Sequence, residues 1–168
     1  MAIFVQEGNR RYESLAALRY LGVPLGNQIY LGQPDGQLAG CEFDITKSLQ
    51  EIAVDIAPDR IFTLGQSGYD GHPDHILTHY SALKSASYLR YLGHGVLAYA
   101  IAPDRVGELE FLADIRYKTG AMALHASQVV VPDLTQWGGE GVYTSLIISS
   151  EIYAEQAKAQ TQMGDTAG

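Results

Sequence analysis

Two histidines three positions apart, His72 and His75, have side chains and a spacing that suit metal binding or acid/base catalysis. They follow a glycine-rich loop, residues 65–71, and are separated by a Pro-Asp pair. Because proline and a carboxylate are typical of the first turn of a helix, both imidazoles are predicted on one face of that turn, continued by His79. A neutral imidazole can bind zinc, and a protonated one can stabilise an oxyanion. The pattern indicates a metal site or an acid/base centre, with Asp74 orienting His72.

Two other interpretations of this segment remain open. In the structural one, His72 caps the helix, Asp74 serves the helix dipole and His75 is a half-exposed surface residue. In the other, Ser67 is a hydrolase nucleophile, because it lies between a strand and a helix. The motif of such enzymes is G-x-S-x-G, however, and Tyr69 stands at its last position, so Ser67 is interpreted as a loop residue.

Helices and short apolar strands alternate along the chain and would position these histidines. Helices are expected at residues 10–21 (capped by Asn9 and ended by Gly22), 44–56 (capped by Asp44), 73–92 and 114–125. Strands are expected at residues 28–31, 60–64, 96–101, 128–131 and 142–149, with a turn at 34–36. This order favours one Rossmann-like α/β domain over residues 1–155, with a mostly parallel sheet, helices on both faces and a frayed tail at 156–168. Ligands of such sheets bind beyond the carboxyl ends of strands, where the loop after Leu64 lies.

The composition excludes several classes of function. The formal charge is −8 and the isoelectric point is near 4.9, so the chain lacks the basic surface that nucleic acid or anionic lipid requires. No apolar run approaches the roughly 20 residues of a membrane helix, and the first residues do not form a secretory leader, which together favour a cytoplasmic protein. The single cysteine, Cys41, predicts neither an internal disulfide nor a thiolate metal site. A small uncharged substrate fits this composition best.

The segment from Gly68 to His75 resembles the second signature of the zinc-dependent LmbE/PIG-L family of N-deacetylases, a glycine or tyrosine loop followed by H-P-D-H. Further segments agree in the same order. Residues 10–23 are similar to the R-x-x-E-x-x-x-A-x-x-x-L-G-V helix of the family, and residues 31–38 to its L-x-x-P-D-G-x-L turn. Residues 118–128, with Lys118, Ala121, His125 and Gln128, look like its K-x-x-A-x-x-x-H-x-S-Q helix end.

The resemblance implies a role for each matching residue. His75 would be a zinc ligand, and His72 would stabilise the tetrahedral intermediate or protonate the leaving amine, supported by Asp74. Arg10 and Asp35 would bind the hydroxyls of an N-acetylglucosamine-type sugar conjugate. Tyr69 lies where the family often has an active-site tyrosine, although Asp70 alters the spacing. The structural alternatives are an Arg10–Glu13 pair, an Asp35 that only forms the turn, and a helix-capping and packing role for His125 and Gln128.

The chain departs from the family pattern at its beginning. The family's first strand ends in an A-H-P-D-D motif that supplies a histidine and an aspartate to zinc and a second aspartate as general base, and no such motif is present here. The first β-α unit and two of three expected zinc ligands are therefore expected to be missing, and residual donors such as His72, His79, Asp70 and Asp74 would bind a metal weakly. A truncated reading frame is favoured over a two-chain enzyme, which would need a complementing fragment, or a degenerate relative that binds a sugar or a partner without catalysis. An unpaired strand edge also favours self-association into a homo-oligomer.

Overall fold

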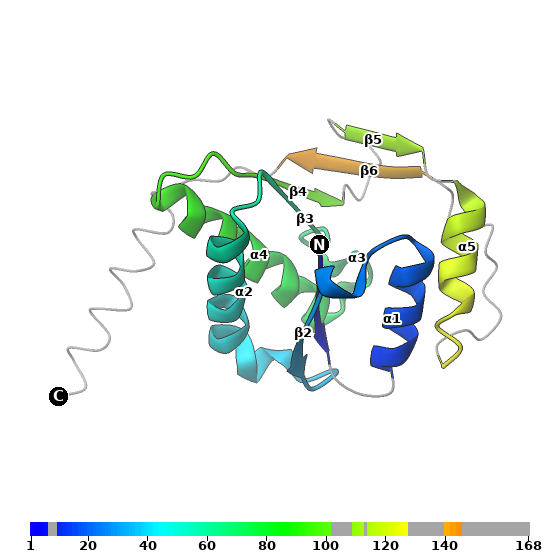
Figure 1. Ribbon diagram of the computed structural model, residues 1–168. Helices are drawn as coiled ribbons and strands as arrows, with labels where there is room; N and C mark the ends of the chain where they lie inside the picture. Colours follow the sequence, from blue (N-terminus) through cyan, green and yellow to red (C-terminus); the bar gives the residue numbers. More distant parts are fainter. Residues whose placement is uncertain (7–9, 102–108, 113, 128–139, 146–168) are drawn as a thin grey trace.

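The computed structural model describes residues 1–6, 10–101, 109–112, 114–127 and 140–145 (Figure 1). Its strands form a two-stranded sheet, β1-β2, and a four-stranded sheet in the order β3-β4-β6-β5. In Figure 1, helices α2 and α4 lie to the left of β1 and β2, and helices α1 and α5 lie to the right. The expected α/β class, with helices on both sides of parallel strands, is therefore confirmed. None of the helices in the described ranges could cross a bilayer.

The first sheet is a parallel β-α-β unit. Strand β1 (Ala2–Gln6) leads to helix α1 (Arg10–Tyr20), and a short 3-10 turn, η1 (Leu25–Asn27), leads into β2 (Gln28–Gln33), which pairs with β1. Gly22 ends the helix as predicted, because its φ of 85° is a backbone conformation that glycine adopts without strain. The amide of Val23 then donates to the carbonyl of Leu18 at 2.8 Å, which closes the last turn.

The second helix begins earlier than the sequence predicts. Helix α2 is Glu42–Ile56 and follows a 3-10 turn, η2 (Leu38–Cys41). The prediction that Asp44 caps this helix is wrong: Cys41 occupies the capping position without a side-chain bond, and Asp44 lies in the first turn. Burial explains the shift, because η2 places Leu38 beside Ile45, both almost fully buried, and so fixes the start of the helix.

The core lies between α2, α4 and the first two strands of the larger sheet. Strand β3 (Arg60–Thr63) leads through the short helix α3 (Gly68–Gly71) to α4 (Pro73–Tyr91), and β4 (Leu97–Ile101) then pairs in parallel with β3. Small residues let α4 approach its neighbours closely, and the hydroxyls of the buried Ser85 and Ser87 donate to carbonyls one turn earlier, so they leave no unpaired group. The main cluster consists of Ala53, Ala86, Leu89, Val96 and Ala98.

The remaining strands are antiparallel, which differs from the predicted, mostly parallel sheet. Strand β6 (Glu140–Ser145) pairs antiparallel with β4 on one side and with β5 (Leu109–Leu112) on the other. Strand β5 was not predicted, and β6 begins earlier than expected. An antiparallel edge is common on an otherwise parallel α/β sheet. The expected cap Asn9, the strand at 128–131 and the tail at 156–168 lie outside the described residues.

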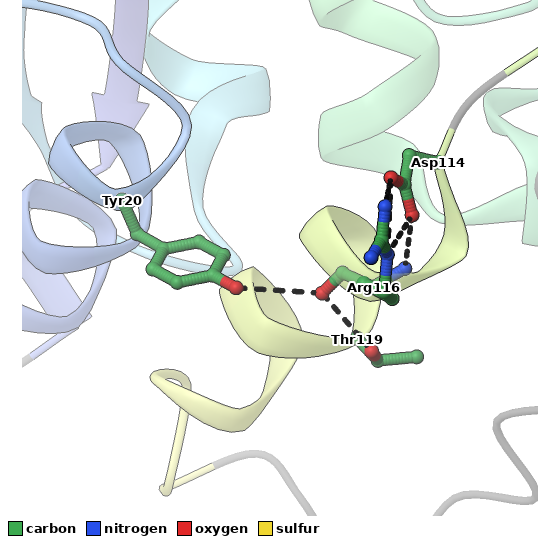
Figure 2. A network of polar contacts seen from close by, with 4 residues as sticks. All are labelled: Tyr20, Asp114, Arg116 and Thr119. Carbon is green, nitrogen blue, oxygen red and sulfur yellow. Dashed lines mark hydrogen bonds and ion pairs between the residues drawn. The ribbon is translucent and has the colours of Figure 1, made fainter.

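Helix α5 (Ile115–Ala123) packs against α1 (Figure 2). Asp114 caps α5, as its predicted start implies, by accepting a hydrogen bond from the amide of Arg116 at 3.0 Å. The Arg116 guanidinium also binds this carboxylate and lowers the pKa of Asp114. The Tyr20 hydroxyl of α1 donates to the carbonyl of Arg116 at 3.5 Å, and its ring lies against Gly120. A β-carbon at Gly120 would overlap that hydroxyl and ring, so the ring can rest in this place only beside a glycine.

Candidate functional site

The loop between β3 and α4 turns on Gly68. This residue has a φ of 66°, and a β-carbon placed on it would lie 2.9 Å from the β-carbon of His75 and 3.1 Å from the amide nitrogen of Ile76. A side chain at position 68 would therefore be strained and would also collide with the first turn of α4. At this position the glycine-rich loop of the sequence needs a glycine, because only then can the backbone approach His75.

His75 is held by this loop in one tautomer. Its Nδ1 lies 3.0 Å from the carbonyl oxygen of Gly68. A carbonyl only accepts hydrogen bonds, so Nδ1 carries the proton and the lone pair of the neutral ring is on Nε2. Histidines that bind metals are commonly oriented in this way, with the other ring nitrogen donating to a backbone carbonyl. In this tautomer the Nε2 atom of His75 is the ring nitrogen that carries a lone pair.

His79 reaches the same loop but is buried. Its Nδ1 lies 2.8 Å from the carbonyl oxygen of Leu64, and only 2% of the residue is exposed. The prediction that His79 continues the face of His75 agrees with this geometry, since both rings point to loop carbonyls. The burial of His79 gives it a structural role, because the ring fastens the end of β3 to α4.

His72 is the capping residue of α4. Its Nδ1 accepts a hydrogen bond from the amide of Asp74 at 3.2 Å, and the His72 and His75 ring centroids are 5.0 Å apart. Because Nδ1 accepts, the proton of the neutral ring is on Nε2. His72 is exposed and His75 is partly buried, so neither ring is enclosed in the apolar core. His72 therefore caps the helix, as the structural interpretation predicts. Its ring still carries a hydrogen-bond donor at Nε2.

The carboxylate of Asp74 connects α4 to the turn after β2. It accepts hydrogen bonds from the amide of Gly36 at 2.7 Å and from the amide of Leu38 at 3.2 Å, and the residue is 2% exposed. The sequence predicted that Asp74 orients His72. The structure places its carboxylate on the turn instead, and the contact with His72 comes from its backbone amide.

Arg10 and Asp35 form an ion pair beside that turn. One guanidinium nitrogen of Arg10 lies 2.7 Å from a carboxylate oxygen of Asp35, and the side chains are 43% and 35% exposed. The sequence interpretation assigned both residues to a sugar, or Arg10 to Glu13, and did not pair them with each other. Their partial exposure leaves polar surface on both groups facing solvent, next to the residues that Asp74 holds.

These contacts put the ends of two strands at one edge of the molecule. The turn after β2 is bound to Asp74, and the loop after β3 is bound to His75 and His79. The carboxyl ends of both strands therefore meet at the first turns of α4, where the sequence predicted the site. Tyr69 lies in α3 at this edge, and its side chain is outside the described part of the structure. Ser67 is exposed at the start of α3.

A second polar contact joins α1 to the segment after α5 and was missed from the sequence. The Glu13 carboxylate accepts hydrogen bonds from the Ser127 amide at 2.8 Å and from its hydroxyl at 2.6 Å. These two bonds, with a smaller attraction from His125, lower the pKa of Glu13. The only sequence signal was that Glu13 and Ser127 both belong to motifs of the same family. His125 follows α5, where its amide donates to Met122 as a helix-ending residue would, and Gln128 is outside the described residues.

A metal site can be tested against these residues. Within the described ranges, no three His, Cys, Asp or Glu side chains are grouped so that they could hold a metal ion. A catalytic zinc normally has three protein ligands, and the described residues do not bring three together. The described residues therefore do not fit a complete zinc site.

Residues 5–86 match the model of the family PIG-L, described as GlcNAc-PI de-N-acetylase. The matched range contains Arg10, Asp35, His72, Asp74 and His75. Over this range the chain is similar to the LmbE/PIG-L family. A comparison with curated proteins found no match.

Among solved structures, one with this family's activity is similar to the chain. It is an N,N′-diacetylchitobiose deacetylase from Pyrococcus horikoshii, in complex with its inhibitor MPG, with a TM-score of 0.59 and 19% sequence identity. The alignment covers 82% of this chain and 62% of the neighbour, so the chain spans less than two thirds of that protein's length. At this identity the likeness shows the fold, which is that of an LmbE/PIG-L deacetylase.

Proposed function

We propose that this chain takes part in removing the N-acetyl group from an N-acetylglucosamine-type sugar conjugate, by hydrolysis of the amide bond. The observation that carries the proposal is the convergence of five family-matched residues, from three separate segments, on one strand edge. They are Arg10, Asp35, His72, Asp74 and His75. An amino-sugar conjugate is also consistent with a formal net charge of −8, which disfavours phosphate-rich partners.

The Arg10–Asp35 pair would bind the sugar. An exposed guanidinium donates hydrogen bonds and a carboxylate accepts them, so together the pair can recognise a hydroxyl that does both. Because Asp74 holds the turn that carries Asp35, this recognition surface has a fixed position relative to α4. Tyr69 stays a predicted substrate contact.

His72 would stabilise the oxyanion that forms when the amide carbon is attacked. Its Nδ1 accepts from the amide of Asp74, so protonating Nδ1 would break that bond. The geometry thus favours a neutral ring that donates from Nε2 over a charged ring that gives its proton to the leaving amine. An oriented donor of this kind contributes about 10²- to 10³-fold to the rate. Asp74 would act as the residue that positions His72.

Zinc dependence belongs to this proposal as well. We propose His75 as one ligand, because the contact of its Nδ1 with the Gly68 carbonyl puts the lone pair of the neutral ring on Nε2. The cytoplasmic location and any oligomer or complementing fragment stay predictions.

A non-catalytic sugar-binding module is the second candidate. It is favoured by one observation, that the described residues bring the Arg10–Asp35 pair together but not three metal ligands. It predicts sugar binding with no turnover under any metal.

The experiment measures sugar affinity and amine release separately. Binding of N-acetylglucosamine is followed by saturation-transfer NMR and calorimetry, and amine release is measured with added zinc and with chelator. Arg10→Met should weaken binding about tenfold, or about 1.4 kcal/mol. The control Arg19→Met, at the exposed end of the same helix, should not. His72→Ala should reduce turnover about 10²- to 10³-fold and leave affinity unchanged.

The outcomes separate the two candidates. Turnover that needs zinc and His75 supports the deacetylase. Binding that depends on Arg10, with no turnover under any metal, supports the binding module. Neither binding nor turnover would overturn both.

A further inference from the structure

Two carboxylates lie within reach of the Arg10 guanidinium. Asp35 binds it directly, with a distance of 2.7 Å between Arg10 Nη1 and Asp35 Oδ2. Glu13 follows Arg10 by three positions in α1, and side chains at this spacing are neighbours on one face of a helix. An aspartate from the turn after β2 and a glutamate from α1 itself can therefore compete for one guanidinium.

In the structure, Arg10 pairs with Asp35 rather than with Glu13. Among the described residues, Arg10 forms an ion pair with Asp35 and none with Glu13. The bonds from Ser127 are the main cause of the lowered pKa of Glu13, and the charge of Arg10 adds a smaller contribution. Arg10 and Glu13 thus attract each other although they are not paired.

Ser127 holds the Glu13 carboxylate in its present orientation. Its amide donates to Glu13 Oε1 at 2.8 Å, and its hydroxyl donates to Glu13 Oε2 at 2.6 Å, so each oxygen of the carboxylate has a donor. To pair with Arg10, Glu13 would have to give up bonds to Ser127 in exchange for one exposed ion pair, and exposed pairs contribute little. The contact with Ser127 therefore favours the pairing of Arg10 with Asp35.

We propose that Ser127 is a positioning residue for the sugar site, acting through Glu13 on Arg10. By binding both oxygens of Glu13, Ser127 keeps this carboxylate away from the guanidinium, which stays with Asp35. This role rests on the proposed function, in which the Arg10–Asp35 pair recognises a sugar hydroxyl. It gives the segment after α5, which is distant from that pair in the sequence, a part in sugar binding.

The first experiment identifies the carboxylate that binds Arg10, and it uses neither sugar nor metal. The guanidinium nitrogen signals of Arg10 in NMR, assigned with Arg10→Lys, respond to the charge of the group that they contact. In the otherwise unchanged protein, Asp35→Asn should shift these signals more than Glu13→Gln does. In Ser127→Ala, Glu13 Oε2 loses its donor and can turn to Arg10, so the order should reverse. Ser127→Thr keeps the hydroxyl and should keep the original order.

The second experiment measures the affinity for N-acetylglucosamine by calorimetry. Ser127→Ala should weaken binding about threefold, a size typical of the loss of one exposed polar pair. Adding Glu13→Gln removes the competing charge and should restore the affinity. A purely structural role of Ser127 predicts no restoration, because Glu13→Gln would damage the same contact further.

Glu51→Gln is the matched control for the restoring variant. Glu51 is an exposed glutamate of another helix, α2, so the same change of charge there should restore neither the affinity of Ser127→Ala nor the order of its NMR shifts. Circular dichroism and the unfolding midpoint check that every variant folds.

Reversal of the order in Ser127→Ala, with the affinity restored by Glu13→Gln and not by Glu51→Gln, supports the proposal. An unchanged order would overturn it, and so would equal restoration by both glutamine variants or by neither. Reversal without loss of affinity would overturn the role of Ser127 in the sugar site. A wild-type protein that binds no sugar would overturn the proposed function, while the NMR order would still decide which carboxylate Arg10 binds.

Discussion

Two carboxylates, Asp74 and Glu13, each accept two hydrogen bonds from a distant part of the chain, and they differ in burial. Asp74 is 2% exposed and binds the amides of Gly36 and Leu38. Glu13 lies at the surface and binds the amide and hydroxyl of Ser127, 114 residues away. Water can replace the partners of Glu13 when its bonds break, but it cannot easily reach those of Asp74. The environment of a hydrogen bond, rather than the sequence separation of its partners, therefore sets its contribution to stability.

The largest effect is expected at the buried carboxylate. Asp74→Asn keeps the size of the side chain but turns one acceptor into a donor that faces a backbone amide. Leaving a buried group without its bond costs about 1 to 3 kcal/mol, so we expect the free energy of unfolding to fall by about 2 kcal/mol. Urea denaturation followed by circular dichroism measures this change.

The matched control for this variant is Asp44→Asn, in the exposed first turn of α2. It should change the unfolding free energy by less than about 0.5 kcal/mol. Equal losses in the two variants would show that the bonds of Asp74 to the turn do not carry the stability of this edge.

A smaller, pH-dependent effect is expected at the surface carboxylate. The bonds from Ser127 hold the pKa of Glu13 below its ordinary value of 4.5. A lowered pKa means that the stabilisation is complete above pH 4.5 and is lost as the pH falls through the pKa of the folded protein. Glu13→Gln should therefore lower the thermal midpoint near neutral pH, by less than Asp74→Asn, and this difference should shrink in acid.

Thermal unfolding of both proteins from pH 3 to pH 7 measures this trend. Ser127→Ala is the companion variant, and the double variant should lose no more than Glu13→Gln alone if the two residues act as a pair. A gap between wild type and Glu13→Gln that widens in acid would contradict the assignment.

The smallest effect is expected at the contact of Tyr20 with Gly120. Alanine favours a helix over glycine by about 1 kcal/mol, but a β-carbon at position 120 would displace the Tyr20 ring. The two effects oppose each other, so Gly120→Ala should change the unfolding free energy by less than about 1 kcal/mol. In a Tyr20→Ala background the same change should stabilise the protein, because the clash is gone. Stabilisation of equal size in both backgrounds would mean that the ring does not rest on Gly120.

Local patterns predicted the elements whose signals lie within a few residues. The stop at Gly22, the start of α4 at Pro73 and the start of α5 near Asp114 follow from backbone preferences that act over one turn. The start of α2 was misplaced because the burial of Leu38 against Ile45 is a tertiary effect. Strand β5 was missed because it has four residues and its pairing with β6 is non-local.

The candidate site shows the same division. The sequence predicted that His72 and His75 share the mouth of a helix, and the structure brings their rings within 5.0 Å between centroids. It did not predict that Asp35 pairs with Arg10 or that Asp74 binds the turn. These contacts depend on how the ends of β2 and β3 come together in space. The spacing of residues along the chain does not predict that arrangement.

One residue, Asp74, holds both halves of the proposed site. Its carboxylate accepts a hydrogen bond from the turn next to Asp35, and its amide donates one to the ring of His72. A ligand that orders the turn would restrict the motion of Asp74. An anion that accepts a hydrogen bond from His72 would restrict it as well. Occupancy at either place should then favour occupancy at the other, and by thermodynamic reciprocity the coupling has the same size in both directions.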